Sequence, residues 1–147
     1  MKRFEFSLQK VLDLREFEKK QAEAELGKAV GEETRIKNTL DLVARQHAQT
    51  VTAADGMHNL TDLYNANRYF ALLEQRKEAL LEELTQAQMV TEEKRETMRE
   101  AMKKQKVLEK LKEKRLASWK KEAQKESDAV LDDITTSNAS NGSLSRL

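Results

Sequence analysis

Cysteine and proline are absent from this sequence of 147 residues, glycine occurs only four times, and aromatic residues make up 5%. Without cysteine the chain has no disulfide framework and no thiolate site, which fits a reducing compartment. Because proline kinks helices and each glycine weakens a helix interior by about 1 kcal/mol, their scarcity permits long uninterrupted helices. The apolar fraction of 38% suits a narrow helical seam better than a thick core.

Long apolar runs and an excess of one charge are also missing. No stretch approaches the roughly 20 apolar residues of a membrane span, and residues 1–7 are too charged for a signal peptide. The net charge is only +1, so bulk charge predicts neither nucleic acid nor a membrane as the partner. We expect a cytoplasmic, soluble protein that does not insert into a membrane.

Groupings of residues that support catalysis are missing as well. His47 and His58 are far apart and have no cysteine beside them, so they do not form a metal site. Carboxylate pairs such as Glu32 and Glu33 would be hydrated on a rod and lack the pocket that a catalytic carboxylate needs. The sequence has no nucleophile–base grouping and no glycine-rich phosphate loop. We therefore expect no enzyme activity, no cofactor and no metal.

One chain-breaking patch, residues 55–59, separates two regions with a seven-residue apolar repeat. Asp55 and Gly56 predict a left-handed end to the first helix near Ala54, and Asn59 or Thr61 can cap the second helix. The fold class is thus all-α, a long two-helix antiparallel coiled-coil hairpin. The expected seam positions are Leu8, Leu12, Arg15, Lys19, Ala22, Leu26, Ala29, Glu33, Ile36, Leu40, Val43, His47 and Thr50, then Leu63, Ala66, Phe70, Leu73, Lys77, Leu80, Leu84, Ala87, Thr91, Lys94, Met98, Ala101 and Leu108.

The predicted coiled coil covers residues 1–134, with helices at about 7–54 and 61–133 and a turn at about 55–60. Residues 135–147 are rich in Ser, Thr and Asn and predict a disordered polar tail. At 1.5 Å per residue the helices would be roughly 70 Å and 105 Å long. Folding about Met57 places Leu8 near Lys106 and leaves an overhang of the second helix, beyond about Glu113, without a partner in the chain.

The overhang has apolar residues at helical spacing and a basic stretch before and within it. A lone tryptophan is typical of a protein interface, so an acidic protein channel is one partner that fits. Anionic lipid, nucleic-acid phosphate, a solvated face, or a generic scaffold that dimerises through the overhang fit as well. The apolar residues are Leu116, Trp119, Ala123 and Val130, and the basic ones are Lys103, Lys104, Lys106, Lys110, Lys112, Lys114, Arg115, Lys120 and Lys121.

Two further features lie beside the seam. Gly27 and Gly31 form a G-x-x-x-G pair, which indicates either close approach of another chain or a locally softened helix. Tyr69 lies next to the seam near the turn, and its ring could contact a second partner.

The N-terminal run Phe4-x-Phe6-x-Leu8-x-x-Val11-Leu12-x-x-Arg15-x-x-Glu18, followed by Ala22 and Leu26, resembles the opening of the flagellar export protein FliJ family. The length, the antiparallel hairpin and the polar tail are similar to that family over nearly the whole chain. The two phenylalanines are the most distinctive part, because a generic coiled coil does not need them ahead of its first helix.

The resemblance implies a component of the flagellar type III export apparatus, which serves motility. Such a protein would lie in the cytoplasm, peripheral to the inner membrane at the flagellar base. It would act as a stalk-like adaptor that binds the hexameric export ATPase, promotes ring assembly and activity, and contacts the export-gate membrane protein and substrate chaperones. Nucleic acid is not an expected partner. Carried onto this chain, the ATPase-ring contacts would be Phe4, Phe6, Leu8, Val11, Leu12, Arg15, Leu108, Leu111, Leu116 and Trp119, and the export-gate contacts would be Leu42, Gln46, Tyr69 and Leu73.

Overall fold

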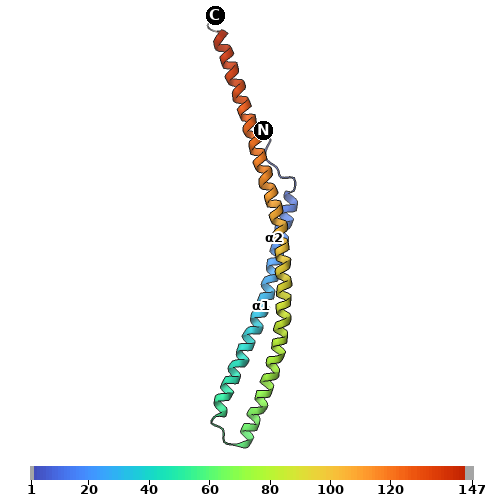
Figure 1. Cartoon of the computed structure of the whole chain (residues 1–147), viewed down its shortest axis with the longest axis vertical. Helices are drawn as coiled ribbons and strands as arrows, with labels where there is room; N and C mark the ends of the chain where they lie inside the picture. Colours follow the sequence, from blue (N-terminus) through green and yellow to red (C-terminus); the bar gives the residue numbers. More distant parts are fainter. Residues whose placement is uncertain (1, 145–147) are drawn as a thin grey trace. The chain divides into compact units, whose positions relative to one another are not determined.

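The computed structural model describes residues 2–144, apart from the side chains of residues 143 and 144, and contains two helices in that range (Figure 1). Helix α1 spans Gln9–Ala54 and helix α2 spans Leu60–Leu144. The chain forms two compact units: unit 1 comprises residues 1–17 and 102–147, and unit 2 comprises residues 18–101. No strand occurs among residues 2–144, so the predicted all-α class is confirmed.

In unit 2 the two helices pack side by side through the predicted seam. Ile36 and Val43 of α1 form one buried cluster with Leu73 and Leu80 of α2, and each of the four is at most 8% exposed. Leu40, Leu84 and Ala87 pack against this cluster. Since these residues recur in steps of three and four, the apolar period of the sequence fixes which face of each helix is buried.

Small and polar residues complete the seam of unit 2. Alanines fill many of its positions, and Thr91 is only 1% exposed. The Thr91 hydroxyl donates to the carbonyl of Ala87, 2.9 Å away in the same helix, so this buried polar group is satisfied locally. His47 is exposed at the edge of the seam, where its ring lies 4.9 Å from that of Phe70.

The turn of unit 2 starts at the predicted residue, but its backbone conformation differs from the prediction. Helix α1 ends at Ala54, yet the predicted left-handed glycine is wrong, because no residue with positive φ occurs among those described. Instead the amides of Gly56 and Met57 donate to the carbonyls three residues earlier, at 3.3 Å and 3.1 Å. Such tight turns satisfy the last carbonyls of a helix without a left-handed residue. The side chain of Asn59 accepts from the Thr61 amide at 3.0 Å, which confirms Asn59 as the cap of α2.

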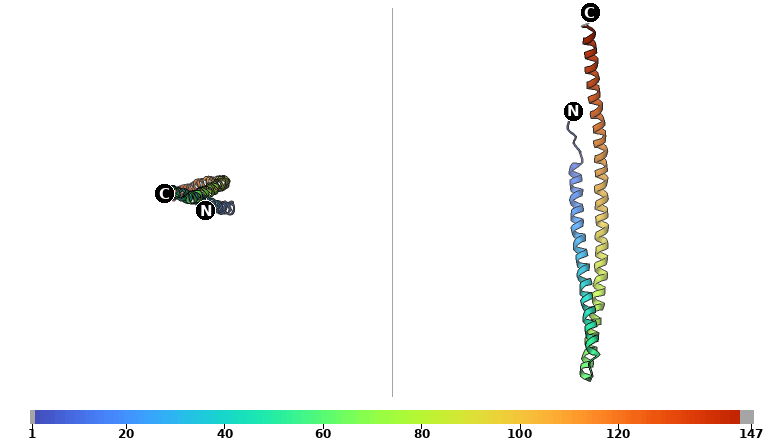
Figure 2. Two further views of the ribbon diagram at one scale, coloured as in Figure 1. Left: turned by 90° about the horizontal axis from the view of Figure 1, so that it is seen from below. Right: turned by 90° about the vertical axis from the view of Figure 1, so that its left-hand side faces the viewer.

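In unit 1 a non-helical segment, residues 2–6, and the first turns of α1 lie along α2 (Figure 2). Gln9 faces Lys112, with 2.7 Å between the side chains, whereas a fold symmetric about Met57 would place residue 9 near residue 105. The predicted register was therefore wrong by about one heptad. Apolar layers determine how coiled-coil helices align, and the midpoint of the turn need not coincide with that alignment.

The C-terminal part of α2 also differs from the prediction. The helix continues to Leu144, where a disordered tail was expected from residue 135, and residues 145–147 lie outside the described part. With no proline and only Gly142 in this stretch, each added residue extends an existing helix without the cost of nucleation. All residues from 124 to 142 are exposed, including Val130, Leu131 and Ile134. Neither helix, as far as it is described, has a segment long and apolar enough to cross a membrane.

Candidate partner-binding surfaces

An aromatic pair joins the N-terminal segment to α2 in unit 1. The ring centroids of Phe4 and Trp119 are 5.9 Å apart and their planes are tilted by 57°, a favourable geometry for two aromatic rings. The indole Nε1 of Trp119 donates to the carbonyl of Lys2 at 3.2 Å. Since both rings are only half-buried, the pair is anchored and still presents apolar surface to solvent.

Arg115 holds the same segment one turn earlier on α2. Its Nη1 donates to the hydroxyl of Ser7 at 2.7 Å, and its guanidinium carbon lies 5.6 Å from the centroid of the Phe6 ring. This second contact is a cation–π interaction, which arginine makes more often than lysine. The sequence interpretation did not assign Arg115 a partner. The sequence feature that could have pointed to Arg115 is that it is the single arginine among the basic residues between 103 and 121.

These contacts show that the unpartnered part of α2 is shorter than the predicted overhang. Residues beyond Glu113 were expected to lack a partner in the chain, and this is wrong for Arg115 and Trp119, which contact residues 2–7. Leu116 and Ala123 are also half-buried, while Val130 is 54% exposed. The uncovered part of α2 therefore begins after Ala123.

All ten residues of the predicted ATPase-ring contact lie in unit 1. Phe6 and Leu12 are buried, at 8% and 3% exposed, so they shape the surface from below. Val11 is 37% exposed. The others are half-buried: Phe4, Leu8, Arg15, Leu108, Leu111, Leu116 and Trp119.

The four residues of the predicted export-gate contact lie in unit 2 and are not equally accessible. Leu42 and Tyr69 are 46% and 38% exposed, whereas Leu73 belongs to the buried cluster. A groove of about 400 Å³ lies along this part of the helix pair, and His47 and Leu73 are among its lining residues. The Gln46 side-chain oxygen is buried and accepts no hydrogen bond from the described residues. An unpaired buried acceptor costs free energy.

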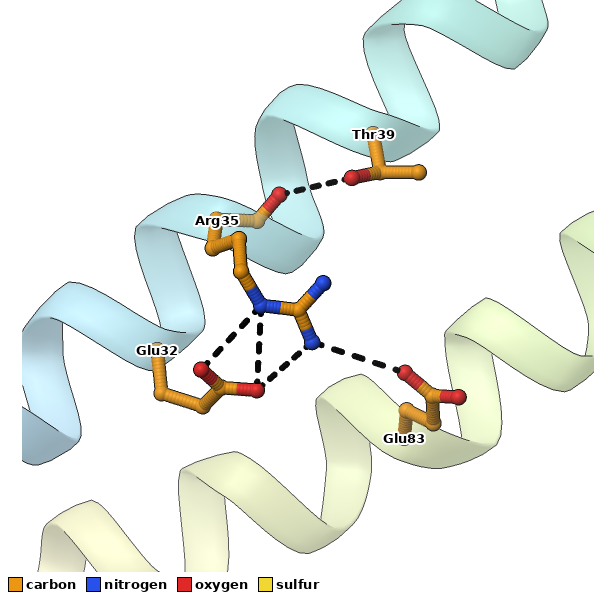
Figure 3. A network of polar contacts seen from close by, with 4 residues as sticks. All are labelled: Glu32, Arg35, Thr39 and Glu83. Carbon is orange, nitrogen blue, oxygen red and sulfur yellow. Dashed lines mark hydrogen bonds and ion pairs between the residues drawn. The ribbon is translucent and has the colours of Figure 1, made fainter.

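A charged group links the helices of unit 2 (Figure 3). The Arg35 guanidinium lies 2.6 Å from one Glu32 oxygen and 3.9 Å from a Glu83 oxygen on α2, and the carbonyl of Arg35 accepts from Thr39. The hydrogen bonds from Arg35 lower the pKa of the Glu32 carboxyl. These side chains are exposed, so water screens their attraction and the group is only a weak cross-link.

The comparisons with known proteins decide the family. The model of the family described as Flagellar FliJ protein matches residues 4–143. The chain belongs to the FliJ family. No curated protein and no solved structure was found to match it. The FliJ family is a non-enzymatic component of flagellar protein export, so this chain has a role associated with the export machinery.

Residues 2–144 contain no group of three His, Asp or Glu side chains that could hold a metal ion. The prominent features of this FliJ-family chain are instead surfaces: the Phe4–Trp119 pair in unit 1 and the groove beside Leu73 in unit 2. Half-buried tryptophan and other aromatic side chains are enriched at protein interfaces in general.

Proposed function

We propose that this chain is a stalk-like adaptor of the flagellar type III export apparatus. In this function it binds the hexameric export ATPase, promotes assembly and activity of the ring, and contacts the export gate and substrate chaperones. It would act in the cytoplasm, peripheral to the inner membrane at the flagellar base. The observation that carries the proposal is the family match over residues 4–143.

The geometry of unit 1 supports the ATPase as its partner. Trp119 and Phe4 form a half-buried aromatic pair, which is the kind of anchor that dominates many protein interfaces. Because Phe6 and Leu12 are buried beneath the surface, they would act by holding the segment in place. Direct contact would come from Phe4, Val11 and Trp119.

The export-gate contact is proposed for unit 2. Leu42 and Tyr69 would touch the gate protein, Gln46 would accept a hydrogen bond from it, and Leu73 would support the groove from inside. The adaptor does no chemistry itself. It changes the populations of ring conformations only through contacts that differ between those conformations.

The test uses the cognate export ATPase, with ATP hydrolysis and ring formation measured with and without this protein. We expect stimulated turnover and more hexamers. In the variant carrying Leu116→Ala and Trp119→Ala, stimulation and affinity should fall while the helix content stays unchanged. Leu131→Ala removes a side chain that is 59% exposed on the same helix and serves as the matched control. Wild-type affinity in the double variant would overturn the assignment of the surface, and no stimulation by the wild type would overturn the adaptor function.

A further inference from the structure

The outer face of α2 in unit 1 has a row of lysines that the proposed function does not use. The residues follow one another in steps of three, four, four and seven, so they share one face of the helix. All of them are exposed, and none is in an ion pair within the described part of the chain. We call them the lysine stripe: Lys103, Lys106, Lys110, Lys114 and Lys121.

The lysine stripe lies opposite the side of α2 that contacts α1 and the N-terminal segment. Leu108, Leu116 and Trp119 are half-buried on that contacting side. The stripe covers 19 residues of helix, a rise of roughly 27 Å at 1.5 Å per residue. It is therefore a straight basic edge that is available to another molecule.

Its composition favours a lipid surface over a protein or a nucleic acid. Protein interfaces are enriched in arginine, tyrosine and tryptophan and depleted in lysine, and the stripe consists of lysine alone. Duplex phosphates follow a helical path, so a straight row of charges meets only some of them. Lysine clusters on a helix are typical of binding to anionic lipid headgroups, where each adds about fivefold to the affinity.

Neighbouring side chains fit the same partner. Met102 and Val107 adjoin the stripe in sequence and are 47% and 66% exposed. Apolar side chains beside lysines can enter the boundary between headgroups and acyl chains. The acidic residues Asp128 and Asp132 continue the same face, but Asp128 lies seven residues beyond Lys121, or roughly 10 Å along the helix. That distance exceeds the screening length of about 8 Å at physiological salt, so these two aspartates do not neutralise the stripe. Glu109 and Glu113 lie nearer, three residues after Lys106 and Lys110, and they reduce the positive charge of this part of α2 without removing it.

We propose that the lysine stripe binds the headgroups of an anionic phospholipid bilayer, with α2 lying on the surface and not entering it. Because the stripe and the Phe4–Trp119 pair are on different sides of unit 1, this contact is separate from the proposed ATPase contact. It goes beyond the proposed function by naming the residues that would hold the adaptor at a membrane.

The test is sedimentation of the full chain with vesicles of phosphatidylglycerol and phosphatidylcholine, and with vesicles of phosphatidylcholine alone. We expect binding to the anionic vesicles only, and weaker binding as salt is added. Replacing all five stripe lysines by glutamine should lower the affinity by about three to four orders of magnitude. Replacing them by arginine should preserve it, because the charge is kept.

A control variant removes the same number of charges elsewhere and should bind almost as well as the wild type. Its five exposed lysines, changed to glutamine, are Lys10, Lys20, Lys28, Lys37 and Lys77. Glutamine and arginine both favour helices, and circular dichroism checks that each variant is folded. The proposal is overturned if the wild type ignores anionic vesicles at low salt, or if the stripe and control variants lose binding equally. It is also overturned if the stripe is required only for binding to a DNA duplex. ATPase stimulation is measured separately and tests the adaptor function. The outcome of the vesicle experiment does not depend on it.

Discussion

Replacing Gly27 and Gly31 by alanine is expected to stabilise the protein by about 2 kcal/mol, because each glycine in a helix interior costs about 1 kcal/mol relative to alanine. Both residues lie inside α1. A Cβ atom built at either position meets nothing within 4 Å, so the alanines bring no clash. Neither glycine has a positive φ angle, so alanine can adopt the same backbone conformation without strain. The full benefit of alanine should therefore be realised.

Urea denaturation followed by circular dichroism measures the effect. For a chain of this size a gain of about 2 kcal/mol raises Tm by roughly 4–8 °C. Ala24→Gly, at an exposed position of the same helix, is the converse control and should cost about 1 kcal/mol. A double alanine variant that is no more stable than the wild type would refute the reasoning.

The same variant separates the two interpretations of the glycine pair. If another chain packs closely against α1 at this point, the added methyl groups should weaken binding to the export ATPase or the gate protein although the fold is more stable. If the glycines only soften the helix locally, binding should be unchanged.

Three further predictions concern unit 2. Ile36→Ala should cost about 2–4 kcal/mol in urea denaturation, because Ile36 is only 2% exposed in the seam, and a loss below about 1 kcal/mol would contradict the seam as its core. Arg35 lowers the pKa of Glu32, so the small stabilisation from this pair is present above the unfolded-state pKa and is lost as pH falls through the lowered value. In Arg35→Met the pKa of Glu32, followed by NMR titration, should return to its usual range, and an unchanged value would show that Arg35 is not the cause. Asn59→Ala should cost about 1 kcal/mol and speed amide exchange at Thr61, because it removes the cap of α2, whereas Asn59→Ser should have little effect.

The sequence was most informative where one physical rule acts along the whole chain. Apolar residues in steps of three and four predict the buried positions Ile36, Val43, Leu73 and Leu80 correctly, since burial of one helical face requires that period. The end of α1 at Ala54 and the cap at Asn59 are local signals, and the structure confirms both.

Features that depend on distant parts of the chain were harder to predict. The register of Gln9 against Lys112 results from the alignment of whole helices, which a local pattern does not contain. The role of Arg115 requires knowing that Ser7 and Phe6 come close to it across more than a hundred residues. The N-terminal phenylalanines were identified from their family-like spacing, but only the structure shows that Phe6 is buried and Phe4 faces Trp119.

The alanines of the unit 2 seam have a mechanical consequence. Ala22, Ala29, Ala66 and Ala101 are all buried there, and small contact residues bring helix axes toward the lower end of the usual range, about 8 Å. With helices about 10–12 Å across, a cross-section of the pair would measure roughly 20 Å by 12 Å. For a beam with two unequal widths, the bending stiffnesses in the two directions differ by the square of the ratio of those widths. Unit 2 should therefore be about three times stiffer in the plane of the two helices than across it. Under a sideways load, unit 2 would bend mainly in the direction perpendicular to the plane of the two helices.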